Sequence, residues 1–348
     1  MSVFLGPGCA GPWGAGRAIV SFSNEGGIFM LVRQLTMVAV GVLLVVPVSA
    51  QEAPQTSWGA PDLQGVWDFR SITPLERPED LADQTFLSEE EAANLEQEAV
   101  DRIEELQNKE AERTEVGGNI GAYNDFWMDR GTNTDDTRRT SLIVDPLNGR
   151  LPEKTEAGEA RSESAPSSFT DKIYASYTEL SNFDRCIMGF NAGPPMTPGA
   201  YNNNMQLLQT PDYVAIVTEM VHTARIIPVG DGAASSNAIR QWSGNSRGHW
   251  EGDTLVVETE HFNDDDVYAN WRSSSKNMMV IERFTRVDTG TLSYEFTVDD
   301  QETWTSPWTA QVSMKRNDLP LFEYACHEGN YAMDAMLSGA RSDEQGGQ

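Results

Sequence analysis

The second half of the chain is dominated by strand-like alternation of apolar and polar residues. From Met205 onward, runs rich in β-branched and aromatic residues end at turn sequences such as Glu251-Gly252-Asp253 and Asp288-Thr289-Gly290. Two of these runs carry a complete apolar face, formed by Leu292, Tyr294, Phe296 and Val298 in one and by Trp308, Ala310, Val312 and Met314 in the other. We expect a mainly β fold, in which at least six strands form an antiparallel β-meander that closes into a barrel or sandwich.

The first 50 residues have the order of a secretory leader. Arg33 precedes a mostly apolar segment that begins at Leu35, and Val48-Ser49-Ala50 is a small-residue cleavage sequence. The apolar run is too short for a stable membrane span. We therefore expect residues 1–50 to be leader and signal peptide, with the true start at Met30. The mature protein would be periplasmic or secreted, without membrane insertion.

Residues 51–135 are predicted to form an N-terminal extended arm and one long helix. The arm is rich in Pro and Trp and has little periodicity, whereas Ser88 and Glu91 have capping-box spacing. Apolar residues then recur at helical intervals, namely Ala92, Leu95, Ala99, Ile103 and Leu106. We expect this segment to wrap a β-barrel domain at residues 136–348, with a mobile loop near residues 152–168.

The chain is strongly acidic. It has 25 Lys and Arg residues against 53 Asp and Glu, which gives a net charge of −28, and 39% of its residues are hydrophobic. That apolar content is enough for a large core, while the charge disfavours nucleic acid and anionic membranes as partners. No GxGxxG, P-loop, GxSxG or HExxH motif is present, and we expect no cofactor.

Two cysteines, Cys186 and Cys326, remain after the predicted cleavage. In an oxidising compartment a leftover pair predicts one disulfide, and two buried free thiols are the alternative.

Six motifs occur together along the predicted mature chain: Pro61-Asp-Leu-Gln-Gly-Val-Trp67, Thr73-Pro-Leu-Glu-Arg-Pro78, Tyr201-Asn-Asn-Asn204, Trp250-Glu-Gly-Asp-Thr-Leu-Val-Val257, Glu282-Arg-Phe-Thr-Arg-Val287 and Glu323-Tyr-Ala-Cys-His-Glu-Gly-Asn330. The set resembles a family of secreted proteins of unassigned function that is abundant in acidobacteria and marine proteobacteria. The resemblance implies export but no particular activity. Gly65-Val-Trp67 is also similar to the G-x-W motif of lipocalins, which implies a lipocalin-like barrel.

Ionisable residues within apolar runs are the candidate catalytic groups. Glu219, His222 and Arg225 fall in or beside one strand, and strand parity places Glu219 and His222 on opposite faces unless a bulge intervenes. The alternative is a core glutamate held by Arg283 or Arg286.

A second candidate group lies around Cys326. The group comprises Glu323, Tyr324, His327 and Glu328. The expected disulfide would bring His327 near Asp184-Arg185, where the histidine could act as a general acid or base. The alternative is a structural cluster that ties two loops together. His222 and His327 lack the local spacing of a metal site, so none is predicted.

Amide and aromatic side chains are the candidate ligand-binding groups, because together they suit sugar rings and aromatic molecules. These residues are Asn202, Asn203, Asn204, Trp242, Trp250 and Tyr324, to which we add Arg225. We expect a small organic ligand, aromatic or sugar-like, inside the barrel. The alternatives are a hydrolase, lyase or isomerase with His and carboxylate acid–base groups, and a structural envelope protein. The sequence does not indicate the oligomeric state.

Overall fold

A computed structural model describes residues 54–108, 128–164, 176–230, 239–263 and 274–346. All of them belong to one compact unit, Ser49–Gln348. The predicted leader, residues 1–50, lies outside the described residues.

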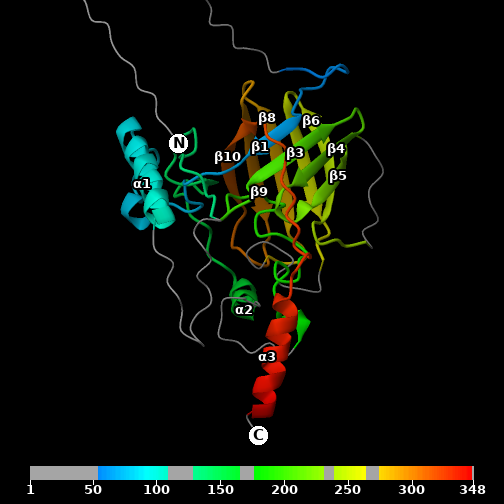
Figure 1. Cartoon of the computed structure of the whole chain (residues 1–348). Coiled ribbons are helices and arrows are strands. Elements are labelled where there is room, and N and C mark those ends of the chain that lie inside the picture. The colour runs from blue at the N-terminus through cyan, green and yellow to red at the C-terminus, as the bar shows by residue number, and fades with distance from the viewer. Residues whose placement is uncertain (1–53, 109–127, 165–175, 231–238, 264–273, 347–348) are drawn as a thin grey trace, which may run out of the picture. The chain divides into compact units, whose positions relative to one another are not determined.

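The described residues form one ten-stranded sheet whose pairs are all antiparallel (Figure 1). The order along the sheet is β5-β4-β3-β1-β10-β9-β8-β7-β6, and β2 pairs with β10 off this path. The strands are β1 (Gly65–Asp68), β2 (Ile143–Asp145), β3 (Asn204–Gln209), β4 (Tyr213–Thr218), β5 (Ala224–Pro228), β6 (Asn245–Glu251), β7 (Thr254–Glu260), β8 (Met279–Arg286), β9 (Thr291–Asp299) and β10 (Trp308–Asn317).

The sheet curves but does not close into a barrel, so that part of the fold prediction is wrong. Its two ends, β5 and β6, meet at one isolated parallel bridge between Val229 and Gly248, where Gly230 N donates to Gly248 O at 2.9 Å. The path contains nine strands that alternate in direction, so β5 and β6 point the same way. Closure would therefore require a parallel ladder in an otherwise antiparallel sheet.

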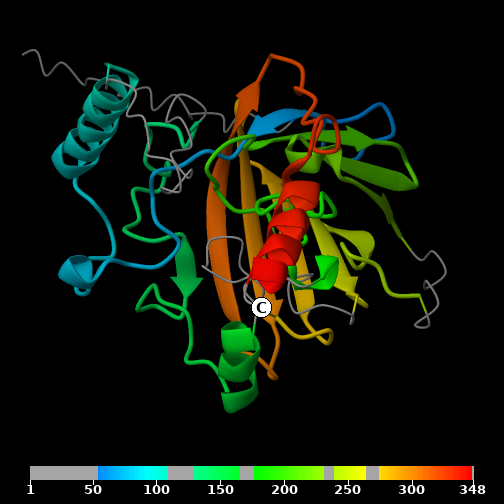
Figure 2. The same cartoon turned by 60° about the horizontal axis from the view of Figure 1, so that its bottom comes forward.

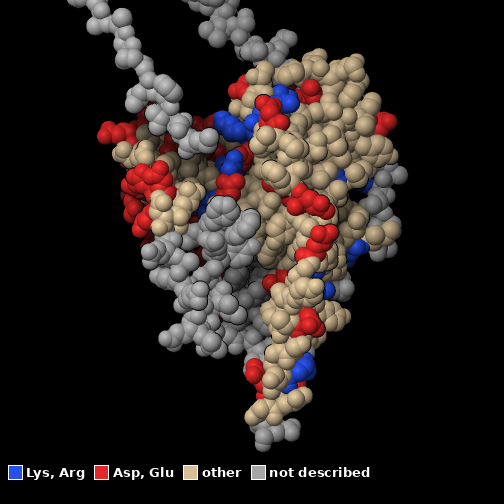
Figure 3. Space-filling model, viewed as in Figure 1, with Lys and Arg blue, Asp and Glu red and all other residues tan. Residues whose placement is uncertain are grey.

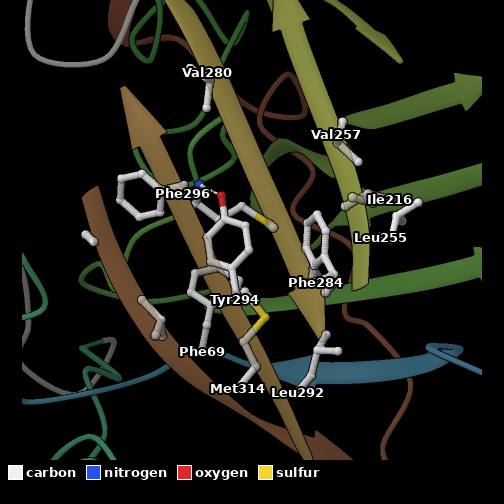
Figure 4. Close-up of a cluster of buried hydrophobic side chains, with 14 of the residues drawn as sticks. Phe69, Ile216, Leu255, Val257, Val280, Phe284, Leu292, Tyr294, Phe296 and Met314 are labelled. Atoms are coloured by element: carbon white, nitrogen blue, oxygen red, sulfur yellow. Dashed lines mark hydrogen bonds between the residues drawn. The ribbon is translucent and has the colours of Figure 1, made fainter. Parts of the chain in front are cut away.

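The predicted alternation of buried and outward residues is confirmed in β9 and β10. All eight residues of the two predicted apolar faces have an exposed fraction of 0%. Figure 4 shows part of this core, in which the ring of Tyr294 lies between those of Phe284 and Phe296, with centroid distances of 5.0 and 5.5 Å. One face of the sheet therefore packs against a continuous hydrocarbon core.

The N-terminal arm enters the sheet, whereas we expected it to wrap around it. β1 lies between β3 and β10, and Trp67 at its centre is completely buried. Indole Nε1 of Trp67 donates to the carbonyl of Leu63 at 2.9 Å, which satisfies its polar group within the core. Four residues are too short for alternation to reveal a strand, which explains why the sequence did not indicate it.

The helices are α1 (Glu89–Asn108), α2 (Glu156–Ser164) and α3 (Ala332–Gly346). The capping box of α1 is confirmed, because Ser88 N donates to Glu91 Oε2 at 2.7 Å and Glu91 N donates to Ser88 Oγ at 3.2 Å. Figure 3 shows acidic side chains gathered on α1. In the part of the chain that the structure describes, no helix is long and apolar enough to cross a membrane.

Two other local predictions differ from the structure. Residues within the predicted mobile loop form α2, because Thr155 Oγ1 accepts from Gly158 N at 3.0 Å and Arg161 Nη2 donates to Glu302 O at 2.7 Å. The sequence also predicts a last strand at Leu321–Cys326, but these residues form irregular chain that leads to α3 (Figure 2).

The predicted disulfide between Cys186 and Cys326 is present, with a Cα–Cα distance of 5.7 Å. It links a loop before β3 to the segment after β10 across a sequence separation of 140 residues. Cys326 packs with a small apolar cluster of Ala192, Met220 and Val221 that is separate from the main core. The disulfide therefore holds two irregular segments against one end of the sheet.

We expect the double substitution Cys186→Ser and Cys326→Ser to lower the free energy of unfolding by about 2–5 kcal/mol, because the unfolded chain gains the entropy of a long loop. Denaturant unfolding with and without reductant measures this. Reductant should destabilise the wild type by a similar amount and leave the double variant unchanged. Equal stability of oxidised and reduced wild type would contradict the prediction.

Candidate functional site

A cleft of about 480 Å³ lies where β3 begins and where β4 and β10 end. It is lined by Arg70, Asp129, Tyr201, Asn202, Asn204, Glu219, Asn317, Leu319, Phe322 and Tyr324. Four of these residues, namely Asn202, Asn204, Glu219 and Tyr324, are among the predicted site residues. The structure therefore brings Tyr324 beside three predicted residues that precede it in the sequence by more than 100 positions.

The cleft is on the side of the sheet that faces away from the core. In β3 the buried side chains are Met205, Leu207 and Gln209, so Asn204 belongs to the opposite set. Asn317 belongs to the outward set of β10 by the same alternation. Asn317 Nδ2 donates to Asn204 Oδ1 at 3.0 Å, which links the two strands across β1.

A tight turn positions Glu219 and His222, so the strand parity predicted for them is wrong. β4 ends at Thr218, whose backbone N–H donates to the carbonyl of Thr223 at 2.9 Å. Within the turn, Val221 and His222 have φ values of 57° and 40°. This left-handed backbone is unfavourable for a β-branched residue such as Val221, and it directs the two candidate side chains independently of the strand.

Glu219 is buried at the cleft, with an exposed fraction of 3%. Its Oε2 accepts from Asn204 Nδ2 at 2.9 Å, and its Oε1 accepts from the backbone N–H of Phe322 at 3.0 Å. Among the described residues no Lys, Arg or His nitrogen lies within 4.0 Å of its carboxylate. Glu219 is therefore held by neutral donors alone.

Neither arginine proposed as a structural partner of Glu219 contacts it. Arg283 donates to Glu251 at 2.7 Å. Arg286 donates to three backbone carbonyls, those of Asp62, Asp288 and Thr289, at 2.7–2.9 Å.

Aromatic rings form another part of the cleft lining. The rings of Tyr201 and Tyr324 are stacked, with centroids 6.1 Å apart and an interplanar angle of 21°. Phe190 contacts Tyr201 edge-on at 5.3 Å, and Phe183 contacts Phe190 at the same distance. Because Cys326 lies two residues after Tyr324, the disulfide fixes the segment that carries this ring. The two tyrosines are thus held in place by packing and by a covalent link.

Arg70 contributes a cation that is already paired. It donates to Asp68 at 2.5 and 2.8 Å and to both oxygens of Asp129 at 2.6 and 2.8 Å. The hydrogen bond with Asp68 is the main reason why the pKa of Arg70 is raised. The positive charge in the cleft is therefore neutralised by its own neighbours.

Arg70 and Asp129 also line a second cleft, of about 660 Å³, next to α1. The polar groups of this second cleft are largely paired. Glu96 accepts from Thr134, Asp135 accepts from Ser313 N at 2.7 Å, and Lys315 donates to Asp136. These contacts tie the segment before β2 to α1 and β10, which is a structural role.

The two candidate histidines are exposed and are not joined to the candidate carboxylates. Nδ1 of His222 donates to the carbonyl oxygen of Tyr324 at 3.2 Å. His327 and Glu328 are exposed, and Asp184 accepts from the hydroxyl of Ser181 at 2.6 Å. In the described ranges, no side-chain hydrogen bond links either histidine to the carboxylate of Glu219 or Glu328, so the expected acid–base pair is not assembled.

The other predicted ligand-binding residues lie outside the cleft lining. Asn203 is buried, and its side-chain amide already has protein partners for both its donors and its acceptor. It donates to Asp129 O and Gly199 O and accepts from Asn191 and Gly199 N. Trp250 packs against the main core. The ring of Trp242 lies 5.9 Å from the guanidinium of Arg185.

Arg225 belongs to a polar cluster inside the core. Nη1 and Nη2 donate to the two oxygens of Glu282 at 2.6 and 2.9 Å, so the pairing is bidentate. The Tyr294 hydroxyl also donates to Glu282, at 2.8 Å, and accepts from Met196 N at 3.0 Å. Glu282 was not among the site residues predicted from the sequence, although it alternates in phase with the buried Val280 and Phe284.

The electrostatics of this cluster follow from its burial. Burial lowers the pKa of Arg225, but the Glu282 carboxylate more than offsets this, and the net shift is upward. Burial, with the neighbouring Glu282 charge, raises the pKa of Tyr294 well above its usual value.

No group of three or more metal-ligating side chains occurs within the residues that the structure describes. Comparisons with protein-family models, curated proteins and solved structures found no match to this chain.

The raised pKa of Tyr294 predicts a loss of stability in alkaline solution. Above pH of about 10 the unfolded chain releases the tyrosine proton that the folded chain retains, so the free energy of unfolding falls by about 1.4 kcal/mol per pH unit. Tyr294→Phe should remove this component of the slope and, near neutral pH, cost about 1 kcal/mol for the lost hydrogen bonds. Denaturant unfolding across this pH range tests it.

The control is Tyr213→Phe, at an exposed tyrosine of β4, which should keep the alkaline slope of the wild type. Identical slopes for wild type and Tyr294→Phe would contradict the prediction.

Proposed function

We propose that this protein binds a small organic ligand, sugar-like or aromatic, in the cleft beside Glu219. The observation that carries the proposal is the combination of two stacked tyrosine rings with amide and carboxylate groups in one concavity. Tyrosine rings cover the face of a sugar or aromatic ring, and amides supply directional hydrogen bonds. A volume of about 480 Å³ lies in the range of small-molecule sites.

The proposed site differs in place from the interior pocket expected from the sequence. Large side chains, including Trp67, Trp304 and Trp308, are completely buried on the inner face of the sheet. The groups with the chemistry to hold a ligand are instead gathered on the outer side, where strands end and two loops meet. A site of this kind can exchange its ligand with solvent without opening the core.

An acid–base enzyme remains the second candidate from the sequence, but the geometry favours binding. A general base must lie within hydrogen-bond reach of its partner or substrate, and His222 instead contacts a backbone carbonyl. The buried carboxylate at the cleft is held by neutral donors, with no histidine beside it. A binding function therefore accounts for the residues of the cleft without requiring a catalytic step.

To test binding, we would measure the affinity of the full mature chain for a panel of monosaccharides, aminosugars, phenols and phenylethylamines by isothermal titration calorimetry. At least one ligand is expected to bind, and Tyr324→Ala should weaken it by about tenfold or more, because the ligand loses an aromatic contact. Tyr331→Ala is the matched control, since this tyrosine is 77% exposed and lies outside the cleft.

Binding that Tyr324→Ala leaves unchanged would move the site elsewhere, and failure of every class in the panel to bind would overturn the proposal.

We further propose that the chain is exported, in keeping with the family that its motifs resemble. The disulfide supports this proposal, because such bonds persist in oxidising compartments. Expression of the full sequence in a bacterial host should yield a mature periplasmic chain that begins at Gln51, as determined by N-terminal sequencing. Ala50→Arg should block cleavage at that position. A periplasmic or secreted chain that retains residues before Gln51 would contradict the predicted cleavage site.

A further inference from the structure

We infer that the ligand of this cleft carries a positively charged amine, which pairs with the carboxylate of Glu219. An aminosugar or an aromatic amine has this chemistry. The inference rests on the proposed binding function and names the ligand class for the same site.

The two buried glutamates, Glu219 and Glu282, differ in their partners. Glu282 has an exposed fraction of 0% and is paired with Arg225, at 2.6 and 2.9 Å. Glu219 is nearly as buried, at 3%, but has no described cation within 4.0 Å. A buried carboxylate is costly unless it is paired and hydrogen-bonded. Since Glu219 borders a cleft and Glu282 does not, a bound ligand is the group that can supply the missing positive charge.

The carboxylate of Glu219 also has unused acceptor positions. A carboxylate offers about four lone-pair directions, and Glu219 uses one on each oxygen for Asn204 Nδ2 and Phe322 N. These two donors fix the orientation of the carboxylate and leave acceptor capacity on both oxygens. An ammonium group, which has donors and no acceptor, is complementary to such a site.

The remaining charges of the cleft favour a cation. Arg70 is neutralised by Asp68 and Asp129, so its charge is not free to attract an anion. The lining then carries Glu219 and Asp129 against Arg70, a formal charge of −1, and Asp68 lies beside it. The chain as a whole has a net charge of −28, which also repels anionic ligands.

The aromatic part of the lining favours an organic cation over a metal ion. Tyrosine faces attract ammonium groups through their quadrupole, and Tyr201 and Tyr324 both border the cleft. Hard metal ions require six or more oxygen ligands or ordered waters, and no cluster of three candidate ligands occurs among the described residues. A carboxylate beside stacked rings is instead typical of a site for organic ammonium groups.

The test compares ligand pairs that differ only in charge. Titration calorimetry of the full mature chain near neutral pH and at low salt would use glucosamine with glucose, and tyramine with tyrosol. In each pair one ammonium group replaces one hydroxyl. We expect the amine of at least one pair to bind about tenfold or more tightly than its neutral partner, and this preference to weaken as salt is added.

Glu219→Gln should abolish the preference for the amine, because the amide keeps an acceptor for Phe322 N but loses the charge. The matched control is Glu105→Gln, at an exposed carboxylate of α1 outside the cleft, which changes the net charge equally and should retain the preference. Thermal unfolding of each variant checks its fold. The ligand-pair comparison on the wild type stands even if Glu219→Gln does not fold.

Four outcomes would overturn the inference. Equal affinity for amine and neutral partner would leave the binding function intact and remove only the charge assignment. Loss of the preference in Glu105→Gln would attribute it to net charge. Binding of calcium alone that depends on Glu219 would indicate a metal site. No binding by any ligand would remove the proposed function as well.

Discussion

The ion pair between Arg225 and Glu282 connects the two ends of the sheet through its interior. Arg225 lies on β5, the terminal strand at one end, and Glu282 lies on β8, near the other end. The hydrogen-bond ladder does not join these ends, apart from the bridge at Val229 and Gly248. A bidentate charged contact, completed by the Tyr294 hydroxyl, therefore fixes how far the sheet curls. Removal of either partner would leave the other charge buried and unpaired. The curvature of the sheet and the packing of the core therefore depend on each other.

The sequence predicted those elements in which alternation spans many residues. β9 and β10 were recognisable because each carries an uninterrupted apolar face, and the capping box located the start of α1. β1 has four residues and enters the sheet from a distant part of the chain, so no local pattern identifies it. Barrel closure also could not be predicted, because it depends on the order of the strands and not on their individual patterns.

For the candidate site, the types of residue in the cleft were easier to predict from the sequence than the positions of their side chains. Two predicted amides and a predicted tyrosine line one cleft with Glu219, which was predicted as a catalytic group. The strand parity of Glu219 failed because β4 ends at Thr218 and a turn with left-handed residues follows. Glu282 was predictable, since it replaces an apolar residue on the buried face of β8. Arg70 and Asp129 could not have been found, because only the fold brings them beside Tyr201 and Glu219.

The odd number of strands along the sheet has a topological consequence. With nine alternating strands, the facing edges of β5 and β6 run in the same direction, and 16 residues connect them, from Val229 to Gly244. No single substitution can alter this parity. Only the gain or loss of a whole strand would let the two edges pair as antiparallel neighbours. An opening of about 220 Å³ lies between these two edges, where strand parity excludes the antiparallel ladder that joins every other neighbouring pair on the path.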